Sequence, residues 1–364
     1  MVADPRHARH ERLVRTLEAE ELDGLLLTSR ANIRYLTGFS GSAGLAVATR
    51  ADLLLVTDFR YHEQARAEAG AVARVEVDSA SVWDRLFREL PSLGPLACIG
   101  YEATGLAVKD ADRLAQAGKA WRWKATGDLV ERLRATKDAG EVAAIRGAAT
   151  LAGAALDTTL GRVRVGMSEL EITGLLEGEL RRLGSEGHPF PTIVASGPRT
   201  ALPHARSSRR TVAAGEWLLL DFGAQLDGYC ADITRTVVVG GRASERQRTL
   251  YELVQGAQLR ARTGVRAGMP GRDADALARE LIEARGFGDA FGHSLGHGLG
   301  LEVHEAPRLS KTSAEPLPAD AVVTIEPGVY LAGEGGVRIE DDVHLSSEGP
   351  VLLTDGRTEL AELV

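Results

Sequence analysis

The sequence predicts an α/β domain over residues 1–133, followed by an α+β domain over residues 134–364. Three observations lead to this prediction. At 364 residues the chain is long for a single hydrophobic core. Helical and strand patterns alternate along its first part. In the second part, pairs of helices alternate with pairs of strands, which is typical of a different architecture.

Hydrophobic periodicity and turn residues predict the elements of the first domain. In order they are a helix over 7–24, a strand over 24–29, a stretch rich in turn residues over 31–44, strands over 44–49 and 51–57, a helix over 61–73, a strand over 74–79, a helix over 82–90, a strand over 97–102 and a helix over 107–117.

The second domain is expected to open with a long helical stretch and then to repeat an order of elements. Ser168, three residues before Glu171, offers a capping box for its second helix. The predicted elements are a helical stretch over 131–163, a helix over 166–184, hairpins from residue 190, helices over 243–262 and 271–286, and strands from residue 322 to the end. The repeated order of helix, helix and hairpin suggests an internal duplication of about 110 residues.

Composition and charge narrow the class of function. The net charge of −8 and the pI of about 5.7 argue against nucleic acid and anionic membrane surfaces as partners. The apolar runs are too short to span a membrane, and the charged N-terminus lacks the apolar core of a signal peptide. The two cysteines, Cys98 and Cys230, have no metal-type or redox-type spacing. We expect a cytoplasmic protein that acts on a small molecule or a peptide.

Two acids, Asp221 and Asp232, stand among apolar residues in a predicted hairpin. A buried carboxylate is costly unless it is paired or binds a metal. If the turn near Asp227 and Gly228 has two loop residues, both acids lie on one face, opposite or diagonal to each other. A three-residue loop would put them on opposite faces. An alternative is that one acid is buried against an arginine and the other is exposed to solvent.

A second pair of acids and a histidine-rich segment extend this pattern. Glu326 and Glu340 flank a glycine-rich turn centred on residue 333, which would place them on one face. His293, His297 and His304 lie close together among glycines. Four carboxylates and a histidine favour Mn²⁺ or Co²⁺, with Zn²⁺ as an alternative. Shared carboxylates also suit two metals about 3.5–4 Å apart, as in two-metal hydrolases.

Together these residues resemble the pita-bread metallopeptidase family, which includes Xaa-Pro dipeptidases (prolidases), Xaa-Pro aminopeptidases, methionine aminopeptidases and creatinases. The resemblance rests on the motifs DFGA, ADITRT, GHGLGLEVHE, TIEPG and VRIED. It implies a creatinase-like N-terminal domain and a pita-bread catalytic domain. It also implies that Asp221 binds one metal, that His297 and Glu326 bind the other, and that Asp232 and Glu340 bridge the two.

The resemblance implies catalytic roles for further residues. A hydroxide that bridges the two metals would attack the carbonyl carbon, and His304 would help to polarise the carbonyl oxygen. Glu326 would pass a proton to the leaving proline nitrogen. His204, in the segment FPTIVASGPRTALPHAR, and His293 would position the substrate.

Three more residues are assigned supporting roles. Arg338 and Thr234 are expected to hold carboxylate ligands in place from behind. Arg308 is the candidate cation for the carboxylate of the substrate. The family often has a Gly-Met pair where this chain has Asp320-Ala321, and we expect only a local difference there.

The leading hypothesis is a Xaa-Pro dipeptidase that acts on a dipeptide or short peptide with proline second, and that forms a homodimer. A Xaa-Pro aminopeptidase acting on longer peptides is the first alternative. A pita-bread protein that binds peptides or proteins without catalysis is the second, and such proteins usually lose metal ligands. Another metal hydrolase such as a phosphatase ranks last, because the chain has no glycine-rich phosphate loop.

Overall fold

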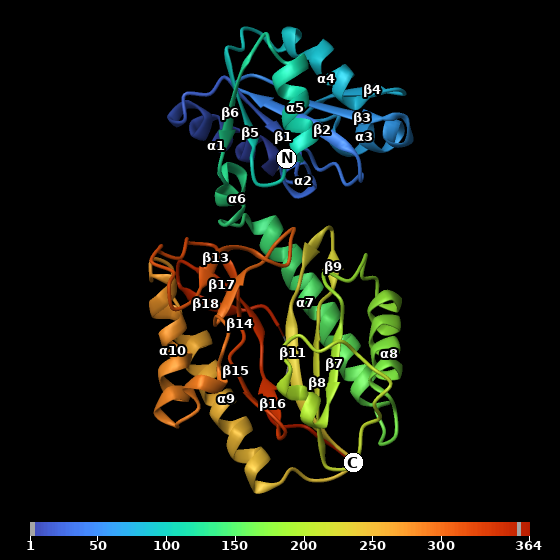
Figure 1. Ribbon diagram of the computed structural model, residues 1–364, viewed down its shortest axis with the longest axis vertical. Helices are drawn as coiled ribbons and strands as arrows, with labels where there is room; N and C mark the ends of the chain where they lie inside the picture. Colours follow the sequence, from blue (N-terminus) through green and yellow to red (C-terminus); the bar gives the residue numbers. More distant parts are fainter. Residues whose placement is uncertain (1–3, 355–357) are drawn as a thin grey trace. The chain divides into compact units, whose positions relative to one another are not determined.

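The structure is a computed structural model that describes residues 4–354 and 358–364, and it divides between Arg134 and Ala135 into two units (Figure 1). The first unit is an α/β domain and the second an α+β domain, as predicted. No helix in the described part of the chain combines the length and the apolar character that crossing a bilayer requires.

The first unit is built on a six-stranded sheet with the order β4-β3-β2-β1-β5-β6. The strand β2 runs antiparallel to both of its neighbours, and the remaining pairs are parallel. All four residues of the central strand β1 are buried, as expected for a strand covered on both faces. The elements are α1 (Pro5–Ala19), β1 (Gly24–Leu27), α2 (Arg30–Thr37), β2 (Gly44–Thr49), β3 (Leu53–Asp58), α3 (His62–Ala69), β4 (Arg74–Asp78), α4 (Val82–Glu89), β5 (Cys98–Glu102), α5 (Val108–Ala117), β6 (Arg122–Thr126) and α6 (Leu129–Arg134).

The helix α2 corrects the prediction for residues 31–44. Ser29 caps this helix by accepting a hydrogen bond from the backbone N–H of Asn32, and Gly38 ends it with a φ of 80°. Ile33 and Leu36 are buried three positions apart on one helical face. The turn residues of this stretch therefore begin only after the helix.

The long helical stretch predicted over 131–163 is two helices. The helix α6 ends at Arg134, and α7 (Ala139–Leu160) begins after Asp138, which forms a capping box with Glu141. The short strand β6 was also not predicted, because its residues carry no clear alternation of apolar and polar side chains.

The second unit contains two helix pairs and two sheets. The sheet orders are β19-β11-β8-β7 and β13-β12-β14-β17-β18, with β9-β10 and β15-β16 as separate two-stranded ribbons. The helices are α7, α8 (Glu169–Arg182), α9 (Glu245–Gly264) and α10 (Gly271–Ala284). The strands are β7 (Ile193–Ser196), β8 (Glu216–Phe222), β9 (Gln225–Leu226), β10 (Tyr229–Cys230), β11 (Ile233–Val239), β12 (Gly296–Gly298), β13 (Glu305–Leu309), β14 (Val322–Ile325), β15 (Gly328–Leu331), β16 (Gly335–Arg338), β17 (Asp341–Ser346), β18 (Gly349–Leu352) and β19 (Glu362–Leu363).

Each helix pair covers its own sheet (Figure 1). Buried residues of α7 and α8, such as Ala152 and Leu176, form one hydrophobic cluster with β7, β8 and β11. Buried residues of α9 and α10, such as Val254 and Ile282, form another with β14 and β17. This repeated arrangement is consistent with the predicted duplication.

Asp320 adopts a left-handed backbone conformation at the position where the family often has glycine. Its φ is 58°, a value that glycine reaches at little cost and that aspartate tolerates better than most residues. Its side chain lies 3.1 Å from Nε2 of His344.

A buried polar network joins the two sheets through Asp341 at the start of β17. The Asp341 carboxylate accepts hydrogen bonds from Arg235 Nη2 at 2.7 Å, Gln258 Nε2 at 2.6 Å, Arg262 Nη1 at 3.0 Å and Thr354 Oγ1 at 2.6 Å. Asp341 is fully buried and Arg235 is 3% exposed. Buried charges of this kind depend on each other, because neither can recover its hydration.

We predict that Asp341→Asn destabilises the protein by about 3–5 kcal/mol, because it removes the negative charge that pairs with the buried Arg235. The measurement is the thermal unfolding midpoint, which should fall by about 6 °C or more. Glu280→Gln is the control, because Glu280 forms an exposed ion pair with Arg260 at 3.0 Å. Equal midpoints for the two variants would contradict this account.

Candidate metal centre

The hairpin between β8 and β11 places Asp221 and Asp232 on one face. Its tip has two loop residues, Asp227 and Gly228, and both have positive φ values, 50° and 79°. Such turns match the twist of a hairpin. Asp221 pairs with Thr234, and Asp232 precedes Thr234 by two positions. The two acids are therefore diagonal neighbours, which is the arrangement expected for a two-residue loop.

Glu326 and Glu340 lie opposite each other between two ladders. The ribbon β15-β16 and the pair β14-β17 share one antiparallel register centred on residue 333. Both glutamates occupy the short connections where one ladder passes into the other. The second pair of acids therefore faces one side, as the sequence predicts.

His297, on β12, presents an unprotonated ring nitrogen to these acids. Its Nδ1 lies 3.0 Å from the carbonyl oxygen of Gly298, so Nδ1 carries the proton and donates it. Its Nε2 lies 3.4 Å from Glu326 Oε1 and 3.8 Å from Asp232 Oδ2. Burial lowers the pKa of His297 to about 4, so the ring is neutral. A lone pair that faces two carboxylates favours a positive charge between them, either a metal ion or a proton on one of the acids.

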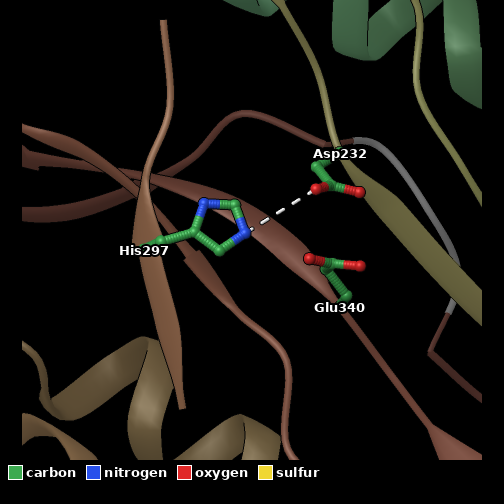
Figure 2. Close-up of side chains that lie close together, drawn as sticks. All are labelled: Asp232, His297 and Glu340. Atoms are coloured by element: carbon green, nitrogen blue, oxygen red, sulfur yellow. Dashed lines mark ion pairs between the residues drawn. The ribbon is translucent and has the colours of Figure 1, made fainter. Parts of the chain in front are cut away.

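The ligand atoms of Asp232, His297 and Glu340 all lie within 4.8 Å of one another (Figure 2). The buried Asp232 Oδ1 has no hydrogen-bond partner among the described residues. Burial and the charge of Glu340 raise the pKa of Asp232, and burial and the charge of Glu326 raise that of Glu340. Burial raises the pKa of Glu326 to about 8. This donor set fits a divalent cation, which would supply the missing positive charge.

Arg338 and Thr234 link the carboxylates of Asp221 and Glu340 through a chain of polar contacts. Arg338 Nη2 forms an ion pair with Asp221 Oδ2, and Arg338 Nε donates to Thr234 Oγ1 at 3.1 Å. Thr234 Oγ1 in turn donates to Glu340 Oε2 at 2.6 Å. The alternative hypothesis for the two aspartates placed one against an arginine and the other in solvent. Its first part is correct, because Asp221 is buried against Arg338. Its second part is wrong, because Asp232 is only 5% exposed.

His293 belongs to a hydrogen-bonded chain that starts at Arg338. Arg338 Nη1 donates to the hydroxyl oxygen of Tyr330 at 2.6 Å, so this hydroxyl donates to His293 Nε2, 2.9 Å away. His293 Nδ1 donates to the carbonyl oxygen of Ser294 at 2.8 Å. Burial lowers the pKa of His293 to about 4, which keeps the ring neutral. His293 Nδ1 is also 4.0 Å from Glu326 Oε2.

The remaining predicted residues lie near His297 and His293. The ring of His304 contacts that of His297 edge to face, with centroids 4.4 Å apart. Arg308, on β13, is paired with His297 in the ladder and is exposed. His204 is exposed on the loop that follows β7. Burial, and to a smaller extent the nearby groups that include His204, lowers the pKa values of His293 and His304, so these rings lie in one neighbourhood.

The sequence did not indicate three further residues that form hydrogen bonds with the predicted ligands or with the residues next to them. Thr324 Oγ1 accepts from the backbone N–H of His297 at 3.1 Å and donates to Glu326 Oε1 at 3.3 Å. The buried Asp342 accepts from the backbone N–H of Asp232 at 3.2 Å. Tyr330 is the third. Thr324 and Asp342 lie two positions from Glu326 and Glu340, so strand alternation could have indicated them.

Comparison with known proteins gives two family matches that together cover most of the chain. The sequence profile of metallopeptidase family M24 matches residues 143–347. The profile of the creatinase/prolidase N-terminal domain matches residues 9–136.

Similar proteins and structures extend over almost the whole chain. A Xaa-Pro dipeptidase of Pyrococcus furiosus is 34% identical over 91% of this chain and 92% of its own length. The structure of a Xaa-Pro dipeptidase from Bacillus anthracis has a TM-score of 0.93 and 39% identity, and covers 98% of this chain and 100% of its own. The structure of an X-Pro aminopeptidase from Thermotoga maritima has a TM-score of 0.90 and 38% identity, and it covers 97% of this chain and 99% of its own.

We predict that Thr234→Val weakens binding of a divalent metal about 10- to 100-fold, because Glu340 loses the hydroxyl that orients it. A competition titration against a chelator measures this affinity. Thr236→Val is a matched control, because Thr236 is buried on the same strand and, within the described part of the chain, its hydroxyl bonds only the backbone of Arg338. Equal metal affinities for the two variants would show that the Thr234 hydroxyl does not orient a ligand.

Proposed function

Because this chain belongs to metallopeptidase family M24, we propose that it is a metal-dependent Xaa-Pro dipeptidase that hydrolyses the bond before proline. The observation that carries the proposal is the group formed by the buried Asp232 and Glu340 with the partly buried His297, whose ligand atoms lie within 4.8 Å of one another. The relatives named Xaa-Pro dipeptidase support the substrate class, since they match this chain over nearly its full length.

Two divalent metals per chain are part of the proposal, with Mn²⁺ as the first choice and Co²⁺ or Zn²⁺ as alternatives. Asp221, Asp232, His297, Glu326 and Glu340 would hold them, because these five residues supply the oxygen and imidazole donors that such ions accept. When bound, the metals supply Lewis acidity, which activates water for attack and polarises the carbonyl group of the substrate.

The protein holds these donors in fixed orientations. Thr234 and Arg338 fix Glu340 and Asp221 from behind, and such contacts raise metal affinity by restricting the ligands. Glu326 directs Oε1 toward His297, and its Oε2 would carry a proton to the leaving nitrogen of proline. A tertiary amide has no N–H, so a site built from metals and side chains suits it.

Histidines and one arginine would contact the substrate. His304 would donate to the carbonyl oxygen as negative charge develops there, and His204 and His293 would position the peptide. Arg308 would bind the C-terminal carboxylate, because a guanidinium matches a carboxylate with two parallel hydrogen bonds.

A Xaa-Pro aminopeptidase remains the alternative activity. The likeness to the X-Pro aminopeptidase structure of Thermotoga maritima supports it nearly as well as the dipeptidase structures support the first choice. A binding protein without catalysis is less well supported, because burying these acids is energetically costly unless they bind a metal.

A cytoplasmic homodimer completes the proposal. Cys98 and Cys230 are both buried and free, which suits a reducing compartment. The homodimer comes from the family resemblance alone.

Removal of metal with a chelator is expected to abolish hydrolysis of Gly-Pro and Leu-Pro, and added Mn²⁺, Co²⁺ or Zn²⁺ to restore it. A Leu-Pro-Xaa tripeptide measured alongside separates the two activities. Restored cleavage of the dipeptides alone supports the dipeptidase, and cleavage of the tripeptide alone would replace it by an aminopeptidase. Cleavage of neither, with metal bound, would contradict the substrate class.

Arg308→Gln is expected to raise KM for Leu-Pro about 10-fold or more and to leave kcat nearly unchanged. Loss of a charged hydrogen bond to a group that does not react weakens the ground state and the transition state equally. Lys311→Gln serves as control, because Lys311 is an exposed cation three residues away. If the two variants have the same KM, Arg308 does not bind the carboxylate.

A further inference from the structure

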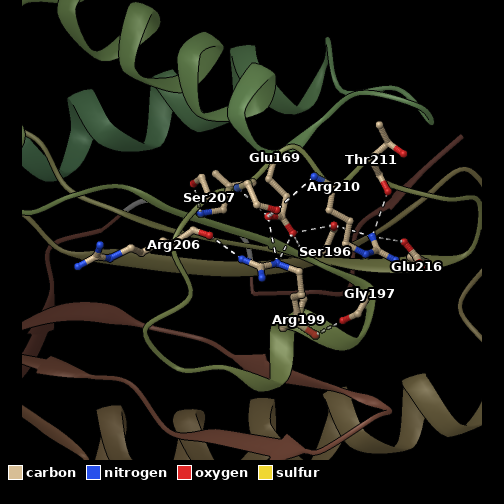
Figure 3. A network of polar contacts seen from close by, with 12 residues as sticks. Glu169, Ser196, Gly197, Arg199, Arg206, Ser207, Arg210, Thr211 and Glu216 are labelled. Atoms are coloured by element: carbon tan, nitrogen blue, oxygen red, sulfur yellow. Dashed lines mark hydrogen bonds and ion pairs between the residues drawn. The ribbon is translucent and has the colours of Figure 1, made fainter.

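Glu169, the first residue of α8, is fully buried and surrounded by hydrogen-bond donors (Figure 3). Its Oε1 accepts from the backbone N–H and the hydroxyl of Ser196, both at 2.9 Å. Its Oε2 accepts from the backbone N–H and the hydroxyl of Ser208, at 2.9 and 2.7 Å. Arg199 Nε donates to both oxygens, at 3.1 and 3.2 Å. These donors replace the water that a buried carboxylate loses.

The two serine donors lie at the two ends of one loop, and Arg199 lies within it. Ser196 and Ser208 flank residues 197–207, which we call the His204 loop. One carboxylate therefore ties both ends of this loop to the start of α8. Within the loop, Arg199 Nη2 donates to the carbonyl oxygen of Arg206 at 2.5 Å (Figure 3). A loop closed at its base in this way loses much of its conformational freedom.

The His204 loop reaches the metal centre on its other side. The backbone N–H of Gly336 donates to Thr200 Oγ1 at 2.7 Å, and Arg338 Nη1 lies 3.4 Å from the carbonyl oxygen of Pro203. Arg338 also forms the ion pair with Asp221. The loop is therefore held between Glu169 on one side and Arg338, which forms an ion pair with Asp221, on the other.

The helix α8 does not need the Glu169 carboxylate to begin. Ser168 Oγ accepts from the backbone N–H of Glu171 at 3.2 Å, and Glu171 Oε2 accepts from the backbone N–H of Ser168 at 2.7 Å. This capping box satisfies the helix start. The Glu169 carboxylate is directed instead at the His204 loop.

We propose that Glu169 is a positioning residue for the peptidase reaction, because its closure of the His204 loop fixes His204 beside the metal centre. This inference rests on the proposed function, in which His204 contacts the substrate. Glu169 itself is buried and acts only through the loop. Its removal would let His204 move away from the position that a productive substrate complex requires.

The test is a double-mutant cycle of Glu169→Gln and His204→Ala, read as kcat/KM for Leu-Pro. The amide nitrogen of glutamine would face N–H and hydroxyl donors, so the loop would lose part of its anchor. We expect kcat/KM to fall about 10- to 100-fold in Glu169→Gln, and the same substitution to change it less than about twofold in His204→Ala. An equal loss in both backgrounds overturns the proposal.

Glu179→Gln is the matched control. Glu179 is also buried on α8 and pairs with Arg162 and Arg182, at 3.0 and 2.6 Å, away from the His204 loop. We expect this variant to keep its kcat/KM. Ser208→Ala removes a single hydroxyl donor, so it gives a milder loss in the same direction if Glu169→Gln does not fold.

Backbone hydrogen exchange of residues 197–208 gives a second readout that needs no activity. We expect faster exchange there in Glu169→Gln, or in Ser208→Ala, than in Glu179→Gln and the unmodified protein. Unchanged exchange overturns the proposal. If the unmodified protein cleaves no Xaa-Pro bond, the proposed function fails, and the exchange comparison still decides whether Glu169 fixes the loop.

Discussion

Buried carboxylates that face one another repel, and the second unit concentrates them where its two hairpins meet. Asp232, Glu326 and Glu340 surround the neutral Nε2 of His297, and burial raises the pKa of each acid. Hydrogen bonds within the protein compensate only part of this cost, since Asp232 Oδ1 has no partner among the described residues. A bound cation removes the repulsion and turns a destabilising cluster into a ligand set.

The rest of the second unit supports this cluster by holding its parts rigid. Two hydrophobic clusters, one under each helix pair, fix the sheets from which the ligands project. Arg338 then links three parts of the centre, since it contacts Asp221, Thr234 and Tyr330. The hydrophobic clusters therefore stabilise the fold away from the candidate metal centre, and the unfavourable repulsion between carboxylates is confined to that centre.

Local sequence patterns predicted the architecture of both units and the faces of both acid pairs. The turn at Asp227 and Gly228 determined the register that makes Asp221 and Asp232 neighbours. Contacts between distant segments were not accessible in this way. The bond from Tyr330 to His293 and the anchoring of Ser208 by Glu169 join elements far apart in sequence, and no local periodicity reports such contacts. The helix α2 was missed because nearby glycines dominated the pattern.

The most direct test of the central claim compares the thermal unfolding of the unmodified protein and of Asp232→Asn, each with a chelator and with Mn²⁺. If the buried acids are held for a cation, Mn²⁺ raises the midpoint of the unmodified protein by several degrees and that of the variant much less. With chelator, Asp232→Asn should unfold at the same or a higher temperature, because one repelling charge is gone. A variant that is less stable with chelator, and that responds to Mn²⁺ like the unmodified protein, would contradict the claim.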